Sequence, residues 1–117
     1  MAIYTNLPVY EECYQLLLSI VTYTRHIQRD LRYTLGEQLK QNTVDMLVLI
    51  FKANKTEKKA DYIASAREKL VEVQVISRIL NDLKQISDRQ YVILVEKTTN
   101  ISKQFASWEK YALSRTQ

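Results

Sequence analysis

Two stretches of the sequence carry basic side chains of the kind that bind phosphate groups. They lie around residues 25–32 and 78–89, which are far apart along the chain. Six basic residues make up the two groups: Arg25, Arg29, Arg32, Arg78, Lys84 and Arg89. Guanidinium and ammonium groups neutralise nucleic-acid phosphates and release their counterions, which gives salt-sensitive, sequence-tolerant binding. A second interpretation is equally open: these charges only keep helix ends hydrated and complement the helix dipoles.

Residue patterns that support catalysis or metal binding are absent from the sequence. The single histidine, His26, has no cysteine nearby, and Tyr23 stands where a Glu-x-x-His motif needs glutamate. One glycine in 117 residues excludes the phosphate-binding loop and the dinucleotide fingerprint. Cys13 lies among apolar residues and is predicted to belong to the core, while His26 is predicted to be hydrated. We therefore expect no enzyme, and no metal, cofactor or small-molecule substrate.

The composition favours a few long helices. One glycine and one proline leave almost no residues for the tight turns that a β protein needs. Apolar residues recur every three or four positions and predict one domain over residues 1–117. Its helices are expected at about 8–25, 35–54, 62–86 and 88–113. Because short connections join antiparallel neighbours, we predict an all-α, up-down-up-down four-helix bundle.

This topology would bring the first and third connections to the same end of the bundle. The six basic residues would then form one surface, although three acidic residues reduce its charge: Asp30, Asp82 and Asp88. A second basic group is expected at the opposite end: Lys55, Lys58, Lys59, Lys110 and Arg115. Tyrosines could add stacking platforms for bases, and three of them lie outside the predicted core: Tyr4, Tyr23 and Tyr33.

Local signals predict where the helices begin. Residues 34–37 (TLGE) match a capping box, which would place Gly36 in the first turn of the second helix. A glycine that permits a close helix–helix approach is the alternative for Gly36. Asp61 is a candidate N-cap of the third helix, and residues 87–90 (SDRQ) form a second capping box.

Each helix has a predicted core-facing stripe. The first is Tyr10, Tyr14, Leu17, Val21 and Thr24. The second includes Leu39, Met46, Ile50 and Ala53. The third is Ile63, Ala66, Leu70, Val73, Ile76, Leu80 and Leu83. The fourth is Tyr91, Leu94, Thr98, Ile101, Phe105, Trp108 and Ala112.

Apolar residues exceed what one bundle core can bury. Residues 46–51 (MLVLIF) are apolar around the whole helix, and 16–21 and 91–95 are nearly so. One interpretation is a single central helix. Because all four helices of a bundle are peripheral, we instead favour subunit packing and a stable, ring-shaped homo-oligomer.

The charge balance and the absence of sorting signals limit the class of binding partner and the expected cellular location. Seventeen basic and thirteen acidic residues give a net charge of +4, which is compatible with nucleic acid or an acidic partner. A lone cysteine suits a reducing compartment. Residues 1–13 do not resemble a signal peptide, and no apolar run is long enough for a membrane span. We expect a cytoplasmic protein without membrane contact.

Four blocks that cover nearly the whole chain resemble a known family. They read LPVYEECYQLLL, RYTLGEQLKQNTVDMLVLIFKAN, ASAREKLVEVQVISRILNDLKQIS and ISKQFASWEKY. The chain resembles the accessory variability determinant (Avd) proteins of diversity-generating retroelements, which are close relatives of the four-helix proteins encoded in 23S rRNA intervening sequences. The resemblance implies a homopentameric barrel that binds RNA or DNA and a dedicated reverse transcriptase.

Two functional hypotheses follow. The first is a non-catalytic nucleic-acid-binding accessory protein, an oligomeric platform that holds a reverse transcriptase or its RNA. The alternative is a structural or protein-interaction bundle of the 23S rRNA intervening-sequence type with no retroelement role. Affinity for nucleic acid across a salt series separates them.

Overall fold

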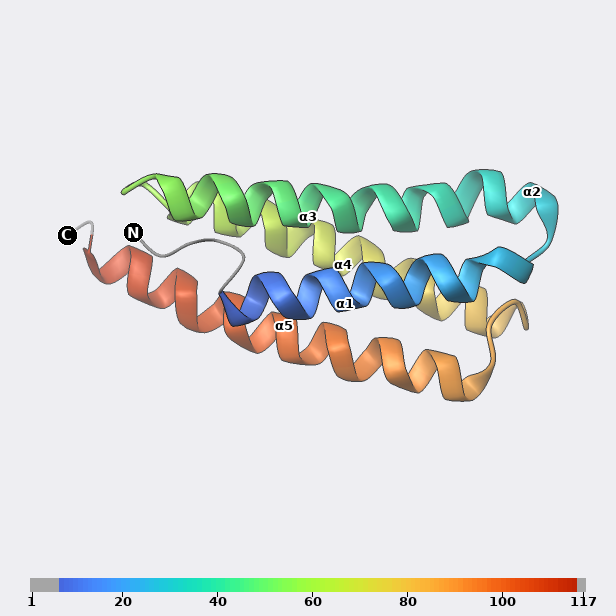
Figure 1. Ribbon diagram of the computed structural model, residues 1–117. Helices are drawn as coiled ribbons and strands as arrows, with labels where there is room; N and C mark the ends of the chain where they lie inside the picture. The colour runs from blue at the N-terminus through green and yellow to red at the C-terminus, as the bar shows by residue number, and fades with distance from the viewer. Residues whose placement is uncertain (1–6, 116–117) are drawn as a thin grey trace.

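The computed structural model describes residues 7–115, and the regular structure in this range is helical (Figure 1). Its four long helices are α1 Pro8–Tyr23, α3 Glu37–Lys55, α4 Ala60–Asp82 and α5 Asp88–Arg115. Three short elements join α1 to α3: the 3-10 turn η2 Thr24–His26, α2 Arg29–Leu31 and the π-helical turn η3 Arg32–Gly36. The predicted all-α fold with four long helices is confirmed for these residues.

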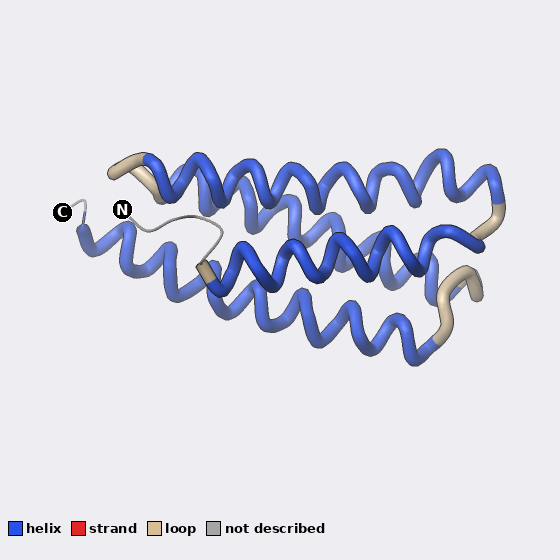
Figure 2. Tube along the Cα trace, viewed as in Figure 1, coloured by secondary structure: helices blue, strands red, loops and turns tan. Residues whose placement is uncertain are grey.

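Each long helix packs against two others. α1 lies between α3 and α5, and α4 lies between the same two helices on the opposite side of the bundle. The bundle measures 48 × 21 × 20 Å. The α1–α2 and α4–α5 connections lie at one end, and the α3–α4 connection lies at the other, where α5 also ends (Figures 1 and 2). In the described part of the chain, no helix has the length and hydropathy to span a membrane.

The core is formed by one apolar stripe from each long helix. Its largest fully buried side chains include Leu16, Ile20, Leu39, Met46, Ile50, Leu80, Ile101 and Phe105. The predicted stripes of α3, α4 and α5 are largely confirmed. The exceptions are Leu83, which is exposed, and Tyr91 and Trp108, which are half-buried. Each fully buried aliphatic or aromatic side chain contributes about 1.5–3 kcal/mol to folding.

The predicted stripe of α1 is largely wrong, although Thr24 is buried and Tyr10 packs half-buried against the core. Tyr14 and Val21 are exposed, whereas the buried residues of the helix are Val9, Cys13, Leu16 and Ile20, followed by Thr24. α1 has apolar residues on two faces, so periodicity alone does not indicate which of the two faces is buried. The choice is made by packing: the small Cys13 side chain lies against α3, with Sγ 3.9 Å from the Thr43 carbonyl oxygen.

The second long helix begins earlier than predicted, at Arg29 rather than at residue 35. The Thr34 hydroxyl donates to the Asp30 carbonyl oxygen (2.8 Å) and caps nothing, so the predicted capping box at 34–37 is wrong. Gly36 therefore lies inside a helix, in the π-helical turn η3. A Cβ there would lie 3.3 Å from Ile27 Cδ1, a tight contact with a side-chain end in the preceding connection and not with another helix.

The predicted capping box at 87–90 is confirmed. The Gln90 N–H donates to Ser87 Oγ (3.1 Å), and the Ser87 N–H donates to Gln90 Oε1 (3.0 Å). At the start of α4, by contrast, Asp61 lies in the first turn, and the N-cap is Lys59, whose side chain makes no capping bond. The predicted Asp61 cap is wrong.

α4 ends at Asp82, four residues before the predicted end, in a Schellman motif. The Gln85 N–H donates to the Leu80 carbonyl oxygen (2.8 Å), and the Lys84 N–H donates to that of Asn81 (2.9 Å). Lys84 has a φ of 64°, in the left-handed region that favours glycine. This turn, and not the helical period, decides where α4 stops.

Replacing Lys84 by glycine is expected to stabilise the protein. The left-handed conformation costs an L-residue about 1 kcal/mol, so Lys84→Gly should raise the free energy of unfolding by about 0.5–1 kcal/mol. Urea denaturation measures the change. Lys84→Ala removes the same charge but keeps the Cβ and should give no such gain; equal effects of the two variants would contradict the explanation.

Candidate nucleic-acid interface

The two connections that carry the predicted basic residues meet at one end of the bundle. The Gln28 N–H donates to Gln85 Oε1 (2.8 Å), which joins the first connection directly to the α4–α5 connection. Beneath them, Ile27 and Ile86 are buried and close the end of the core. We call this end, with its six basic residues, the basic end: Arg25, Arg29, Arg32, Arg78, Lys84 and Arg89.

Arg29, Arg32 and Tyr33 lie close together at the basic end. The guanidinium carbons of Arg29 and Arg32 each lie 5.9 Å from the centre of the Tyr33 ring, within the range of cation–π contacts. Arg32 is half-buried, and its Nη1 donates to the Arg25 carbonyl oxygen (3.3 Å). The Tyr33 side chain is 64% exposed, so an accessible aromatic ring lies close to two cations.

The sequence pattern did not predict this arrangement, because residues 29–33 were expected to lie in a connection between helices. In the structure they are helical, and positions 29, 32 and 33 share one face through their i, i+3 and i+4 spacing. Of the three tyrosines proposed as stacking platforms, Tyr33 is exposed and Tyr23 is half-buried against the core. Tyr4 lies outside the described residues.

The α4–α5 side of the basic end is open to solvent. Arg78 pairs with Asp82 (Nε to Oδ2 3.8 Å), but both side chains are largely exposed, so the pair contributes little to stability. Lys84 and Arg89 are exposed, and neither forms an ion pair within residues 7–115. The Asp88 carboxylate accepts a hydrogen bond from Asn81 Nδ2 (2.9 Å). These cations are therefore available to a ligand.

Side chains, and not helix dipoles, set the electrostatic potential at this end. α1 and α4 end here, while α2 and α5 begin here, so two negative and two positive helix termini lie close together. Their partial charges largely cancel. The excess of basic over acidic side chains remains as the source of positive potential.

The described residues contain no group of three metal-binding side chains. His26 is exposed in η2, as expected of a hydrated residue. Cys13 is fully buried, as predicted, and burial raises the pKa of its thiol to about 12. At neutral pH the thiol is therefore protonated and unreactive.

The stability of the protein is expected to fall at alkaline pH because of Cys13. The thiol pKa is higher in the folded chain than the ordinary value of 9.0, so the folded state holds the proton more tightly. Its contribution is complete below pH 9.0 and is lost toward pH 12, by about 1 kcal/mol per pH unit. Unfolding measured between about pH 9 and 11 should show this slope. Cys13→Ala should have a flatter slope over that range; identical slopes would contradict the assignment.

Exposed apolar side chains cover two opposite sides of the bundle. The α1/α3 face consists of Tyr14, Leu18, Val21, Val44 and Val48. The α4/α5 face consists of Val71, Val75, Ile79, Val92 and Val95. These side chains are between 37 and 56% exposed. Since α1 with α3 and α4 with α5 form opposite sides of the four-helix arrangement, the two faces point away from each other.

Ion pairs between the helices locate these faces. Glu12 pairs with Lys97 (3.9 Å), so this edge of α1 lies against α5, and the edge with Tyr14 and Leu18 faces away from it. Arg67 pairs with Glu109 (2.7 Å) and marks the groove between α4 and α5. Val71 follows Arg67 by one helical turn and lies beside this groove.

Neither a scan of the chain against models of protein families nor a search of curated proteins finds a match.

Proposed function

We propose that this chain is a non-catalytic nucleic-acid-binding accessory protein that acts as a ring-shaped homo-oligomer. The observation that supports this function is the basic end, where cations from two distant connections are joined by the Gln28–Gln85 hydrogen bond. Exposed guanidinium and ammonium groups on such a surface contact phosphates and release counterions. Tyr33, whose ring lies within 5.9 Å of the guanidinium carbons of Arg29 and Arg32, adds a ring on which a base can stack.

The two apolar faces support the proposed assembly. Contact between the α1/α3 face of one copy and the α4/α5 face of the next is head-to-tail, and such contacts close into a ring when the rotation permits. The family resemblance implies five copies. A rotation axis parallel to the bundles would place all basic ends on one side of the ring. The small excess of basic over acidic side chains at each basic end would then be repeated around that side.

The proposed partner is a reverse transcriptase. This part of the proposal rests on the resemblance to the Avd proteins, which implies that a platform of this kind holds the polymerase or its RNA. The basic end would contact the nucleic acid, and the remaining surface of the ring would contact the protein.

A salt series tests the nucleic-acid part of the proposal. Binding of structured RNA and of duplex DNA is measured by fluorescence anisotropy at increasing salt. For duplex DNA, three to five phosphate contacts would give a slope of log K against log salt of about −3 to −5. Absence of binding at physiological salt would contradict the proposal and favour the alternative, a ring that serves only as a protein-interaction module.

A further inference from the structure

The end of the bundle opposite the basic end contains a pocket of about 670 Å³. It lies where α3 and α5 end and α4 begins, and we call it the far pocket. Three basic side chains and one acidic one line it, together with two aromatic rings: Lys55, Glu57, Lys59, Trp108, Tyr111 and Arg115. The bundle is 48 Å long, so this pocket is a separate site from the basic end.

Lys59 holds a fixed positive charge in the far pocket. Its part-buried ammonium group donates to the carbonyl oxygens of Ala53 (2.9 Å) and Thr56 (2.7 Å) at the end of α3. These bonds complement the negative end of the helix dipole. An ammonium group has three N–H donors, and these two bonds use two of them.

Two further cations lie against aromatic rings at the same place. The Arg115 guanidinium carbon lies 6.0 Å from the centre of the Tyr111 ring, and Lys55 Nζ lies 4.6 Å from the centre of the Phe51 ring. Such contacts favour side-chain positions close to the rings. With Lys59 they give three positive charges, opposed in the pocket only by Glu57 among the described residues.

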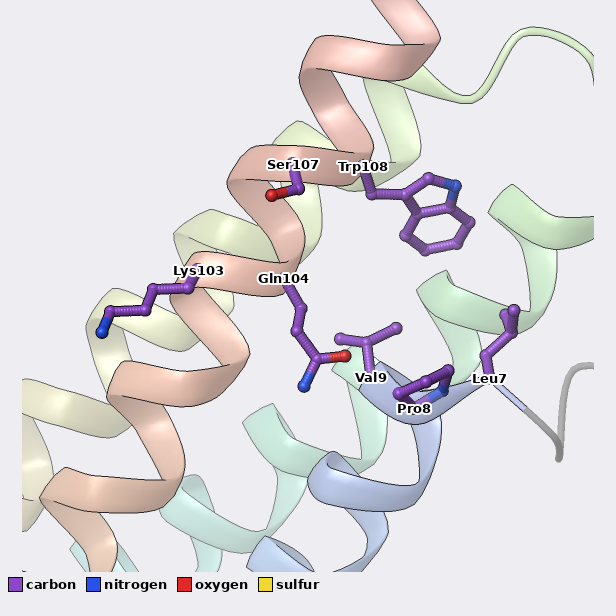
Figure 3. A pocket seen from close by; sticks show the side chains of 7 residues that line it. All are labelled: Leu7, Pro8, Val9, Lys103, Gln104, Ser107 and Trp108. Carbon is purple, nitrogen blue, oxygen red and sulfur yellow. The ribbon is translucent and has the colours of Figure 1, made fainter.

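The aromatic wall comes from α5. Trp108 and Tyr111 are three residues apart and so lie on neighbouring parts of one helix surface. Figure 3 shows the indole of Trp108 near Leu7, Pro8 and Val9 at the start of α1, where it also lines a second pocket of about 450 Å³. The half-buried indole thus lines both pockets, and it presents apolar surface beside the three cations.

We propose that the far pocket binds a nucleoside phosphate. The planar base would lie against Trp108 and Tyr111, and the phosphate would lie among Lys55, Lys59 and Arg115. A simple anion would make no use of the aromatic wall, and an apolar ligand would make no use of the cations. The ligand is a free nucleotide or the terminal nucleotide of a nucleic-acid strand, since both present the same group.

Trp108 is the only tryptophan in the chain, so its fluorescence reports on this pocket directly. Adenosine monophosphate, adenosine and inorganic phosphate are titrated separately against the complete protein. We expect a saturable change in emission with adenosine monophosphate, and at least about tenfold weaker binding of the other two. Phosphate alone binding as tightly as the nucleotide, or no saturable change with the nucleotide, would overturn the proposal.

Charge reversals test the assigned cations. Lys55→Glu and Arg115→Glu change exposed side chains and should each weaken nucleotide binding at least about tenfold. Lys52→Glu is the matched control, because Lys52 lies on the same helix as Lys55 but outside the pocket. This variant should leave nucleotide binding unchanged. An equal loss in all three variants would overturn the proposal, because it would show that only net charge matters.

Two further measurements define the ligand and separate this proposal from the proposed function. A short oligonucleotide with a terminal phosphate that competes with adenosine monophosphate and binds more tightly identifies a strand end; weaker binding identifies the free nucleotide. Charge reversal of Arg29 and Arg89 at the basic end should leave the titration unchanged. The far pocket can therefore bind nucleotide even if the basic end binds no nucleic acid, and the reverse also holds.

Discussion

Reversing the charge of Arg29, Arg32 and Arg89 to glutamate is expected to lower the affinity for RNA and duplex DNA by at least about 100-fold at physiological salt. The change removes three cations that neutralise phosphates and introduces three carboxylates that repel the backbone. The slope of log K against log salt should become shallower by about 1 for each phosphate that is no longer neutralised. Fluorescence anisotropy across a salt series measures both quantities.

The matched control reverses three exposed lysines away from the basic end: Lys52, Lys103 and Lys110. It changes the net charge by the same amount, so an equal loss of binding would contradict a specific role for the basic end. Because Arg32 is half-buried, a second variant reverses only Arg29 and Arg89. Circular dichroism and light scattering should show that every variant keeps its helices and its assembly.

Placing a charge on either apolar face is expected to convert the assembly into monomers. Leu18→Glu changes the α1/α3 face, and Val75→Glu changes the α4/α5 face; both side chains are about half exposed in the isolated chain, so the fold should persist. Burying an unpaired carboxylate at a subunit contact costs several kcal/mol. Light scattering should find a particle of 13.8 kDa for each variant and a multiple of that mass for the unmodified protein.

A mixture of the two variants tests whether the contact is head-to-tail. Each variant keeps one intact face, and the two intact faces are complementary, so the mixture should form one-to-one dimers and nothing larger. Gln38→Glu, an exposed change outside both faces, should leave the assembly unaltered. A single variant that dimerises by itself would show that like faces pair and would contradict the ring. A monomeric unmodified protein would contradict assembly altogether.

Signals that depend on neighbouring residues predicted the fold well. The capping box at residues 87–90 is predicted from these four residues alone, and Ser87 and Gln90 form its two hydrogen bonds in the structure. The core stripes of α3, α4 and α5 followed from periodicity because apolar residues recur every three or four positions along each of these helices. Cys13 was predicted to belong to the core, and burial of its thiol agrees with this.

The errors arose where two local signals competed. Residues 34–37 have the letters of a capping box, but the chain is already helical from Arg29, so the Thr34 hydroxyl bonds within the helix. As a result, the shared face of Arg29, Arg32 and Tyr33 was not predicted. Six basic residues were assigned to one end from topology, and the Gln28–Gln85 hydrogen bond now shows how the two connections meet.

Local sequence by itself determined the all-helical class, most helix positions and three of the four core stripes, because helix formation and amphipathicity depend on residues a few positions apart. The tertiary structure alone decided which face of α1 is buried, how Gly36 comes to lie against Ile27 and how Trp108 comes to line the same pocket as Lys55. Each of these depends on how separate segments of the chain pack together, and no periodic pattern encodes such packing.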